Sequence, residues 1–75
     1  MPEVSTTFEL EHAKLRLKQQ IKRAHKLTER LTEQAADQSL MPVDRQSAAK
    51  RAKLSIEASQ GLERSLERVE EALDA

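Results

Sequence analysis

The sequence predicts an all-α fold, an antiparallel two-helix hairpin that dimerises into a four-helix bundle. Charged residues make up 35% of the 75 residues and aromatic residues 1%, with one glycine and two prolines. This composition is typical of long helices and coiled coils. The second observation is a mirror about Met41 and Pro42. Apolar residues on its two sides pair so that their numbers sum to 83: Leu10 with Leu73, Leu17 with Leu66, Ile21 with Leu62, Leu27 with Ile56, and Leu31 with Ala52. An antiparallel hairpin would place these partners at equal heights.

The first helix is predicted over about residues 7–37. Thr6 can cap it, because its hydroxyl and the Glu9 side chain can form a reciprocal capping box. No glycine or proline interrupts the segment, and its apolar residues share one face of a helix. That stripe comprises Leu10, Ala13, Leu17, Ile21, Ala24, Leu27, Leu31 and Ala35.

A bend is predicted over about residues 38–43. Pro42 lacks an amide hydrogen and disfavours the α conformation at Met41. We expect the apolar residues Leu40, Met41 and Val43 to fold back and close the end of the bundle. Asp44 is the predicted cap of the second helix.

The second helix is predicted over about residues 44–73, with its own apolar stripe facing the first. The seam between the helices is expected to comprise Leu10, Leu17, Ile21, Leu27, Leu31, Ile56, Leu62, Leu66, Val69 and Leu73. A single hairpin of this length buries little core, and cysteine is absent, so oligomerisation is the expected source of further stability.

A strip of mostly small residues beside the second stripe predicts the dimer contact. Its members are Leu54, Ala58, Gly61, Ser65 and Ala72. Glycine inside a helix costs roughly 1 kcal/mol relative to alanine, which a close helix–helix approach could offset. The alternative is that small residues are merely tolerated on a solvent-exposed face. Under the first interpretation, the strip packs most simply against the second helix of a symmetry-related chain, and two hairpins form a four-helix bundle.

The charge distribution supports the antiparallel register. The 13 basic and 13 acidic residues balance overall, which excludes bulk attraction to nucleic acid or to an anionic membrane. Locally, residues 14–30 are strongly basic and residues 57–74 mostly acidic, so the hairpin would bring opposite charges level. These charges are expected to favour the register, each exposed pair by about 0–1 kcal/mol.

One basic row suggests an alternative function. Arg16, Arg23, Lys26 and Arg30 follow helical spacing on the outward side of the first helix. Such a row can bind the phosphates of RNA or DNA, with affinity that falls steeply as salt rises. No aromatic residue in the row could stack on bases, and a charged row is more often a solvated face.

No catalytic residue, metal ligand or cofactor site is predicted. The sequence has no glycine-rich turn that could present a nucleophile or hold a phosphate. Glu9 and His12 have the Glu-x-x-His spacing used in di-iron bundles, level with Glu70, Glu71 and Asp74, but they border helix ends rather than a bundle core. We therefore expect a protein that is not an enzyme.

The expected function is that of a small interaction or regulatory module. A homodimeric bundle would present a helical face to a partner protein, and nucleic-acid binding is the alternative. No apolar run is long enough to span a membrane, and no secretory signal is recognised, so the expected location is cytoplasmic.

Overall fold

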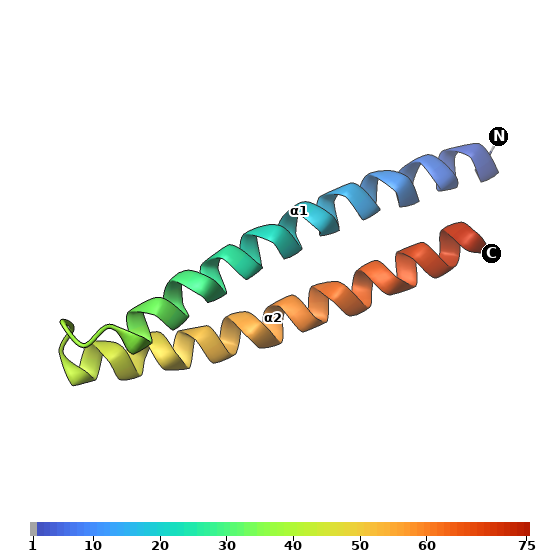
Figure 1. The fold of residues 1–75 in the computed structure, drawn as a ribbon. Coiled ribbons are helices and arrows are strands. Elements are labelled where there is room, and N and C mark those ends of the chain that lie inside the picture. Colours follow the sequence, from blue (N-terminus) through green and yellow to red (C-terminus); the bar gives the residue numbers. More distant parts are fainter. Residues whose placement is uncertain (1) are drawn as a thin grey trace.

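The protein is a hairpin of two long helices that lie side by side (Figure 1). The computed structural model describes residues 2–75, and side chains from residue 6 onward. Helix α1 spans Pro2–Ala36 and helix α2 spans Pro42–Asp74, and the described residues include no strand. The Cα trace extends over 58 × 14 × 13 Å, with a radius of gyration of 17.1 Å. A compact domain of this length would have about 11 Å. The predicted all-α antiparallel hairpin is confirmed, as an elongated rod.

Helix α1 begins at Pro2, earlier than the predicted start near residue 7. Proline is favoured at the first position of a helix, because its missing amide hydrogen would have no intrahelical partner there. Thr6 lies within the helix, so it is not the N-cap that the sequence suggested.

Helix α1 ends at a hydrogen-bonded turn. The Oδ1 atom of Asp37 accepts hydrogen bonds from the Ser39 amide at 2.9 Å and from the Ser39 hydroxyl at 2.6 Å. These bonds stabilise the carboxylate and lower the pKa of Asp37 below its usual value. The Leu40 amide also donates to the Asp37 carbonyl at 3.2 Å, which reverses the chain.

Helix α2 begins at Pro42, which the sequence assigned to the bend. Met41 is its N-cap, with extended φ and ψ angles of −62° and 146°. Proline fixes a helical φ angle, so it can start a helix that it could not continue. Asp44 therefore lies in the first turn rather than at the cap, where its charge favours the positive end of the helix dipole. Met41 and Val43 are 66% and 68% exposed, so the prediction that they close the bundle end was wrong.

The predicted register agrees with a contact at the middle of the hairpin. The hydroxyls of Thr28 and Ser55 lie 2.7 Å apart, and their residue numbers sum to 83. This is the sum that the mirrored apolar residues share.

The predicted seam was wrong at this height. Leu27 and Ile56 are 48% and 43% exposed, and their neighbours Thr28 and Ser55 face the opposite helix instead. Each residue advances a helix by 100°, so Leu27 lies roughly 80° from the centre of its stripe while Thr28 lies close to it. Helix geometry therefore outweighed the greater hydrophobicity of leucine.

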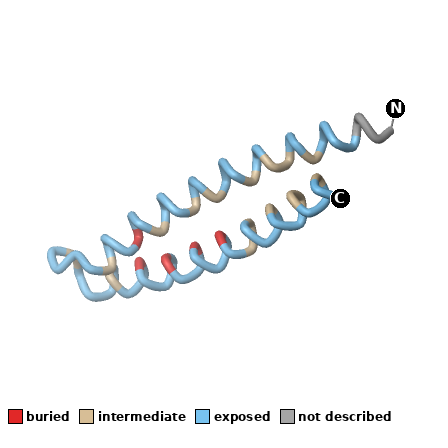
Figure 2. Tube along the Cα trace, turned by 45° about the vertical axis from the view of Figure 1, so that its right-hand side comes forward, coloured by how far each residue is buried: buried red, intermediate tan, exposed pale blue. Residues whose placement is uncertain are grey.

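Burial differs between the two halves of the hairpin (Figure 2). We call residues 24–59 the bend half, and residues 6–23 with 60–75 the open half. Every buried residue among those described lies in the bend half: Leu31, Ala48, Ala52, Ser55 and Ser59. The open half carries most of the large seam side chains, all partly exposed: Leu10, Leu17, Ile21, Leu62, Leu66, Val69 and Leu73.

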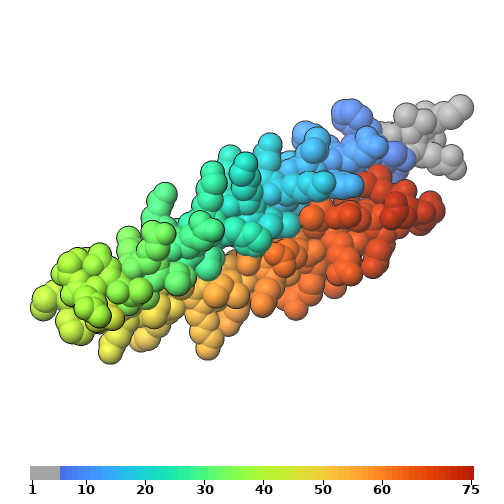
Figure 3. Space-filling view, viewed as in Figure 1, coloured from blue at the N-terminus to red at the C-terminus, as the bar shows by residue number. Residues whose placement is uncertain are grey.

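Side chains of both helices meet along the rod in the space-filling view (Figure 3). Nevertheless, no described side chain is less than 2% exposed. A seam only two helices wide therefore leaves its largest aliphatic groups partly in water.

Candidate interaction surfaces

The hairpin has two broad faces, one on each side of the seam, and the first carries charged residues. Its central groove is lined by His25, Thr28, Glu29, Ile56, Ser59, Gln60 and Glu63. Here His25 Nε2 lies 3.1 Å from Glu63 Oε1, with both side chains about half exposed. We call this side the charged face.

The charged face continues to the open end of the rod. Glu11, Lys14 and Lys18 line a groove there, and positions 11, 18 and 25 are spaced by seven residues, so they share one flank of α1. Among the side chains that the structure describes, His25–Glu63 is the only ion pair within 4.0 Å. Within 4.0 Å, the charge pairing that the sequence predicted along the hairpin is therefore limited, among these described side chains, to this one contact.

The opposite face is mixed in character near the bend and mostly apolar or small beyond it. Near the bend it has a groove lined by Gln34, Leu40, Asp44, Ser47, Ala48 and Arg51. Residues seven apart lie on the same flank of a helix, so this flank continues along both helices. In α1 it runs from Gln34 to Leu27. In α2 it runs from Ser47 to Leu54 and from Arg51 to Ala58 and Ser65. Together with the partly exposed Leu62, these positions define what we call the apolar face: Leu27, Leu54, Ala58, Leu62 and Ser65.

The small strip predicted for dimerisation lies at the edge of the apolar face and away from α1. Leu54 is 64% exposed, and Ala58, Ser65 and Ala72 are exposed as well. A Cβ atom built on Gly61 would meet nothing within 4 Å. The packing of α1 against α2 therefore does not explain this glycine, and the strip is open to another molecule.

The four residues predicted to contact nucleic acid are all exposed. Arg16, Arg23, Lys26 and Arg30 form one outward row on α1, and the structure gives none of them an ion-pair partner within 4.0 Å. Arg16 and Arg23 lie seven residues apart, and this spacing continues to Arg30. This arginine row runs along the α1 edge of the apolar face, whereas the small strip lies along its α2 edge.

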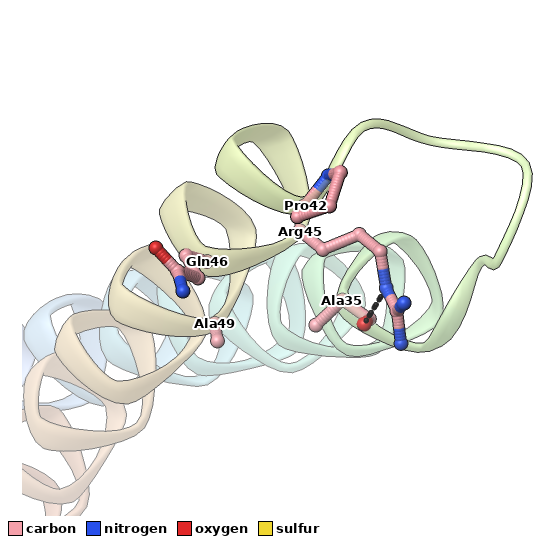
Figure 4. Close-up of a pocket in the computed structure, with 5 residues that line it drawn as sticks. All are labelled: Ala35, Pro42, Arg45, Gln46 and Ala49. Atoms are coloured by element: carbon pink, nitrogen blue, oxygen red, sulfur yellow. Dashed lines mark hydrogen bonds between the residues drawn. The ribbon is translucent and has the colours of Figure 1, made fainter.

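A second groove at the bend is shallow and is bordered by an arginine contact between the helices (Figure 4). Arg45 reaches from α2 to the end of α1, where its Nε atom donates to the Ala35 carbonyl oxygen at 3.1 Å. Pro42, Gln46 and Ala49 complete the lining. The guanidinium thereby satisfies a carbonyl that the end of a helix leaves unpaired.

The buried hydroxyl groups of the seam were not predicted as a group. The hydroxyls of Thr28 and Ser55 lie 2.7 Å apart, and both are within hydrogen-bond distance of the Ala24 carbonyl, at 2.8 Å and 3.2 Å. Ser59 donates to the Ile56 carbonyl at 2.8 Å. These bonds satisfy the hydroxyls within the two-helix seam, and none of them involves a histidine or a carboxylate that could act as a base. The signal for Thr28 and Ser55 was their position near the centre of each stripe.

The described residues contain no group of three or more potential metal ligands close enough to share an ion, including the region of His12. None of the described helices combines the length and apolar character needed to cross a bilayer.

The exposed apolar face and the arginine row are therefore the candidate interaction surfaces. Comparisons with protein-family models, with curated protein sequences and with solved structures found no match to this chain.

Proposed function

We propose that this protein is a non-enzymatic interaction module that pairs with a second copy and presents its outer helical surface to a partner protein. The observation that carries the proposal is the poor burial of the open half. Its seam contains Leu10, Leu17, Leu66 and Leu73, yet each remains partly exposed in the hairpin alone. Aliphatic side chains gain stability when they are removed from water, at about 25 cal/mol for each Å².

The exposed area supports association. The chain exposes 6227 Å², whereas a compact monomer of 8.5 kDa would expose about 4,700 Å². The excess of about 1,500 Å² is comparable to the area that each subunit of an obligate dimer buries, roughly 1,000–2,500 Å². Two hairpins packed as a four-helix coiled-coil bundle would cover a surface of this size.

Sedimentation equilibrium at micromolar concentration tests the assembly. The expected mass is about 17 kDa, twice the 8.5 kDa of one chain. Circular dichroism of the same samples reports whether the helices persist. A fully helical species with the mass of one chain would contradict the proposed dimer.

Phe8 and Leu15 are the proposed contact for a partner protein. They are 71% and 61% exposed and one heptad apart on α1, and Leu15 also borders the groove that Lys14 and Lys18 line at the open end of the charged face. A dimer formed through another face would leave them accessible for a helix-in-groove contact.

Capture of partners from the native host would test this contact. Wild type is compared with a Phe8→Ser, Leu15→Ser variant, and an Ala49→Ser variant serves as an exposed control on α2. We expect the double variant alone to lose partners that the wild type retains in high salt. Equal recovery with all three baits would contradict the proposed contact.

A cytoplasmic site of action is part of the proposal, and fractionation of cells that express a tagged chain would test it.

The arginine row favours a second candidate function, binding to nucleic-acid phosphates. Its support is the exposure of Arg16, Arg23, Lys26 and Arg30 without neighbouring carboxylates within 4.0 Å. A gel shift with duplex and hairpin RNA tests it, and affinity should fall at least roughly 100-fold from 50 to 200 mM salt if several phosphates are contacted. Absence of a shift at tens of micromolar protein in low salt would rule this candidate out. An apolar docking site, by contrast, should respond little to salt.

A further inference from the structure

We infer that the apolar face, rather than the charged face, is the surface on which the second copy packs. This inference rests on the proposed homodimer and identifies which side of the hairpin forms it. The two faces offer a direct comparison, because Leu27 and Ile56 lie at equal heights and on opposite sides of the seam.

The charged face is costly to cover with a second copy. Burial there would remove Lys14, Lys18, His25, Glu29 and Glu63 from water. Only His25 and Glu63 contact each other directly, so the remaining charges would lose hydration without a partner inside the chain. An uncompensated buried charge is strongly unfavourable.

The apolar face carries no such penalty at its centre. Leu27, Leu54, Ala58, Leu62 and Ser65 are uncharged, and the two exposed leucines there are 48% and 64% accessible. The hydroxyl of Ser65 is already satisfied, since it donates to the Gly61 carbonyl at 3.1 Å. Covering these five positions therefore removes aliphatic area from water, whereas two ionised groups of α2, Asp44 and Arg51, line the groove at the bend end of the face.

The edges of the apolar face also fit a second copy. One edge is the arginine row of α1, and the other is the small strip of α2, which shares Leu54, Ala58 and Ser65 with the face and has Arg51 and Arg68 in the same helical spacing. A two-fold axis that sets α1 of each chain beside α2 of its partner brings the arginine row against a strip of mostly small residues. The alternative, α1 beside α1, would bring two arginine rows together and is opposed by like-charge repulsion. The open space around Gly61 lies on the edge that would receive the arginine stems.

A matched pair of substitutions tests this inference. Leu27→Glu and Ile56→Glu make the same chemical change at similarly exposed aliphatic positions in helix interiors, one on each face. We expect Leu27→Glu to raise the dimer Kd at least about 100-fold in sedimentation equilibrium, because it places a carboxylate in the interface. Ile56→Glu should change the Kd less than about threefold. If Leu27→Glu also unfolds the chain, retained assembly and helicity in Ile56→Glu still identify the face.

The other outcomes separate the inference from the proposed function. A monomeric wild type would overturn both. A dimeric wild type that dissociates with Ile56→Glu, or that neither substitution weakens, would overturn the assignment of the face and leave the dimer intact. The wild-type Kd should also change less than about threefold between 50 and 500 mM salt. Dimerisation that tightens steeply with salt would overturn the arrangement of α1 beside α2, since salt screens repulsion between arginine rows.

Discussion

The bend half and the open half of the hairpin achieve burial in different ways. In the bend half, α2 is lined with small residues, including Ala48, Ala52 and Ser55, and these are buried together with Leu31 of α1. The open half has larger side chains, such as Leu17 and Leu66, which remain partly exposed. Small side chains let two helices cover each other, whereas large ones stand out from a seam only two helices wide. The large seam side chains of the open half are thus only partly covered by the lone hairpin.

Removing the largest buried side chain should have the greatest effect on the bend half. Leu31 is 7% exposed, so Leu31→Ala should lower the free energy of unfolding by about 2–3 kcal/mol. Urea denaturation followed by circular dichroism measures this loss, with Leu15→Ala as a control at a 61% exposed position. The control should lose less than about 0.5 kcal/mol. Equal losses would mean that Leu31 is not part of a packed core.

The same measurement on Leu66→Ala tests the contrast between the halves. In a lone hairpin the partly exposed Leu66 should contribute clearly less than Leu31. In a dimer that covers the open half, Leu66→Ala should lower the free energy of unfolding by about 2–3 kcal/mol at high protein concentration, the range expected for Leu31→Ala. A loss that does not depend on protein concentration would argue against coverage of this half by a second copy.

Enlarging a small residue should disrupt the bend half through steric overlap. Ala52 is 8% exposed. Ala52→Leu should lower the free energy of unfolding by about 1–3 kcal/mol, because the space between α2 and α1 does not fit the larger side chain. Ala49→Leu makes the same change at an exposed position of α2 and should be nearly neutral. Thermal melting of both variants provides the comparison, and similar melting temperatures would show that small size is not required at Ala52.

Removing the hydroxyl bridge should have a smaller effect. Ser55→Ala eliminates the contact with Thr28 but leaves Thr28 bonded to the Ala24 carbonyl, so the expected cost is about 1 kcal/mol. Adding Thr28→Val should cost less than the two single losses combined, because either single variant already removes the bond between the two hydroxyls. A double-mutant cycle measures the coupling. Strictly additive losses would indicate that the two hydroxyls do not stabilise each other.

The smallest effect is expected at the turn that joins the two helices. The hydrogen bonds from Ser39 lower the pKa of Asp37, so they stabilise the folded chain above the usual carboxyl pKa of about 3.9 and lose this contribution as the pH falls through the lower folded value. Asp37→Ala should therefore melt slightly below wild type at pH 7, and the difference should shrink at pH 2–3. Ser39→Ala retains the carboxylate and should show only part of the effect. A difference that grows in acid would contradict this assignment.

The sequence predicted the hairpin and its register because both depend on patterns that extend over many residues. Helical periodicity places the seam, and the mirror about Met41 and Pro42 sets which heights meet. Single positions were harder to predict. Leu27 was assigned to the seam by hydrophobicity, but Thr28 lies nearer the centre of the stripe and faces α2. Pro42 was assigned to the bend, although it can equally begin a helix.

The interaction surface was only partly predictable. The small strip and the arginine row could be found from helical spacing, and the structure shows both exposed. The pairing of the small strip with Leu27 on one face could not be foreseen, because Leu27 was expected inside the seam. Each helix carries more aliphatic residues than one neighbouring helix can cover, so hydrophobicity alone does not indicate which of them remain for another chain.

The contacts at the bend also determine how the chain can fold. Arg45 reaches the Ala35 carbonyl across 10 residues, whereas His25 and Glu63 are separated by 38. Closing the longer loop directly from the unfolded chain costs about 1.2 kcal/mol more in chain entropy. Once Arg45 and Ala35 have met, each later contact closes only a short additional loop. The hairpin should therefore form first at the bend and zip toward its termini, so that the leucine-rich ends are the last to join and the first to fray.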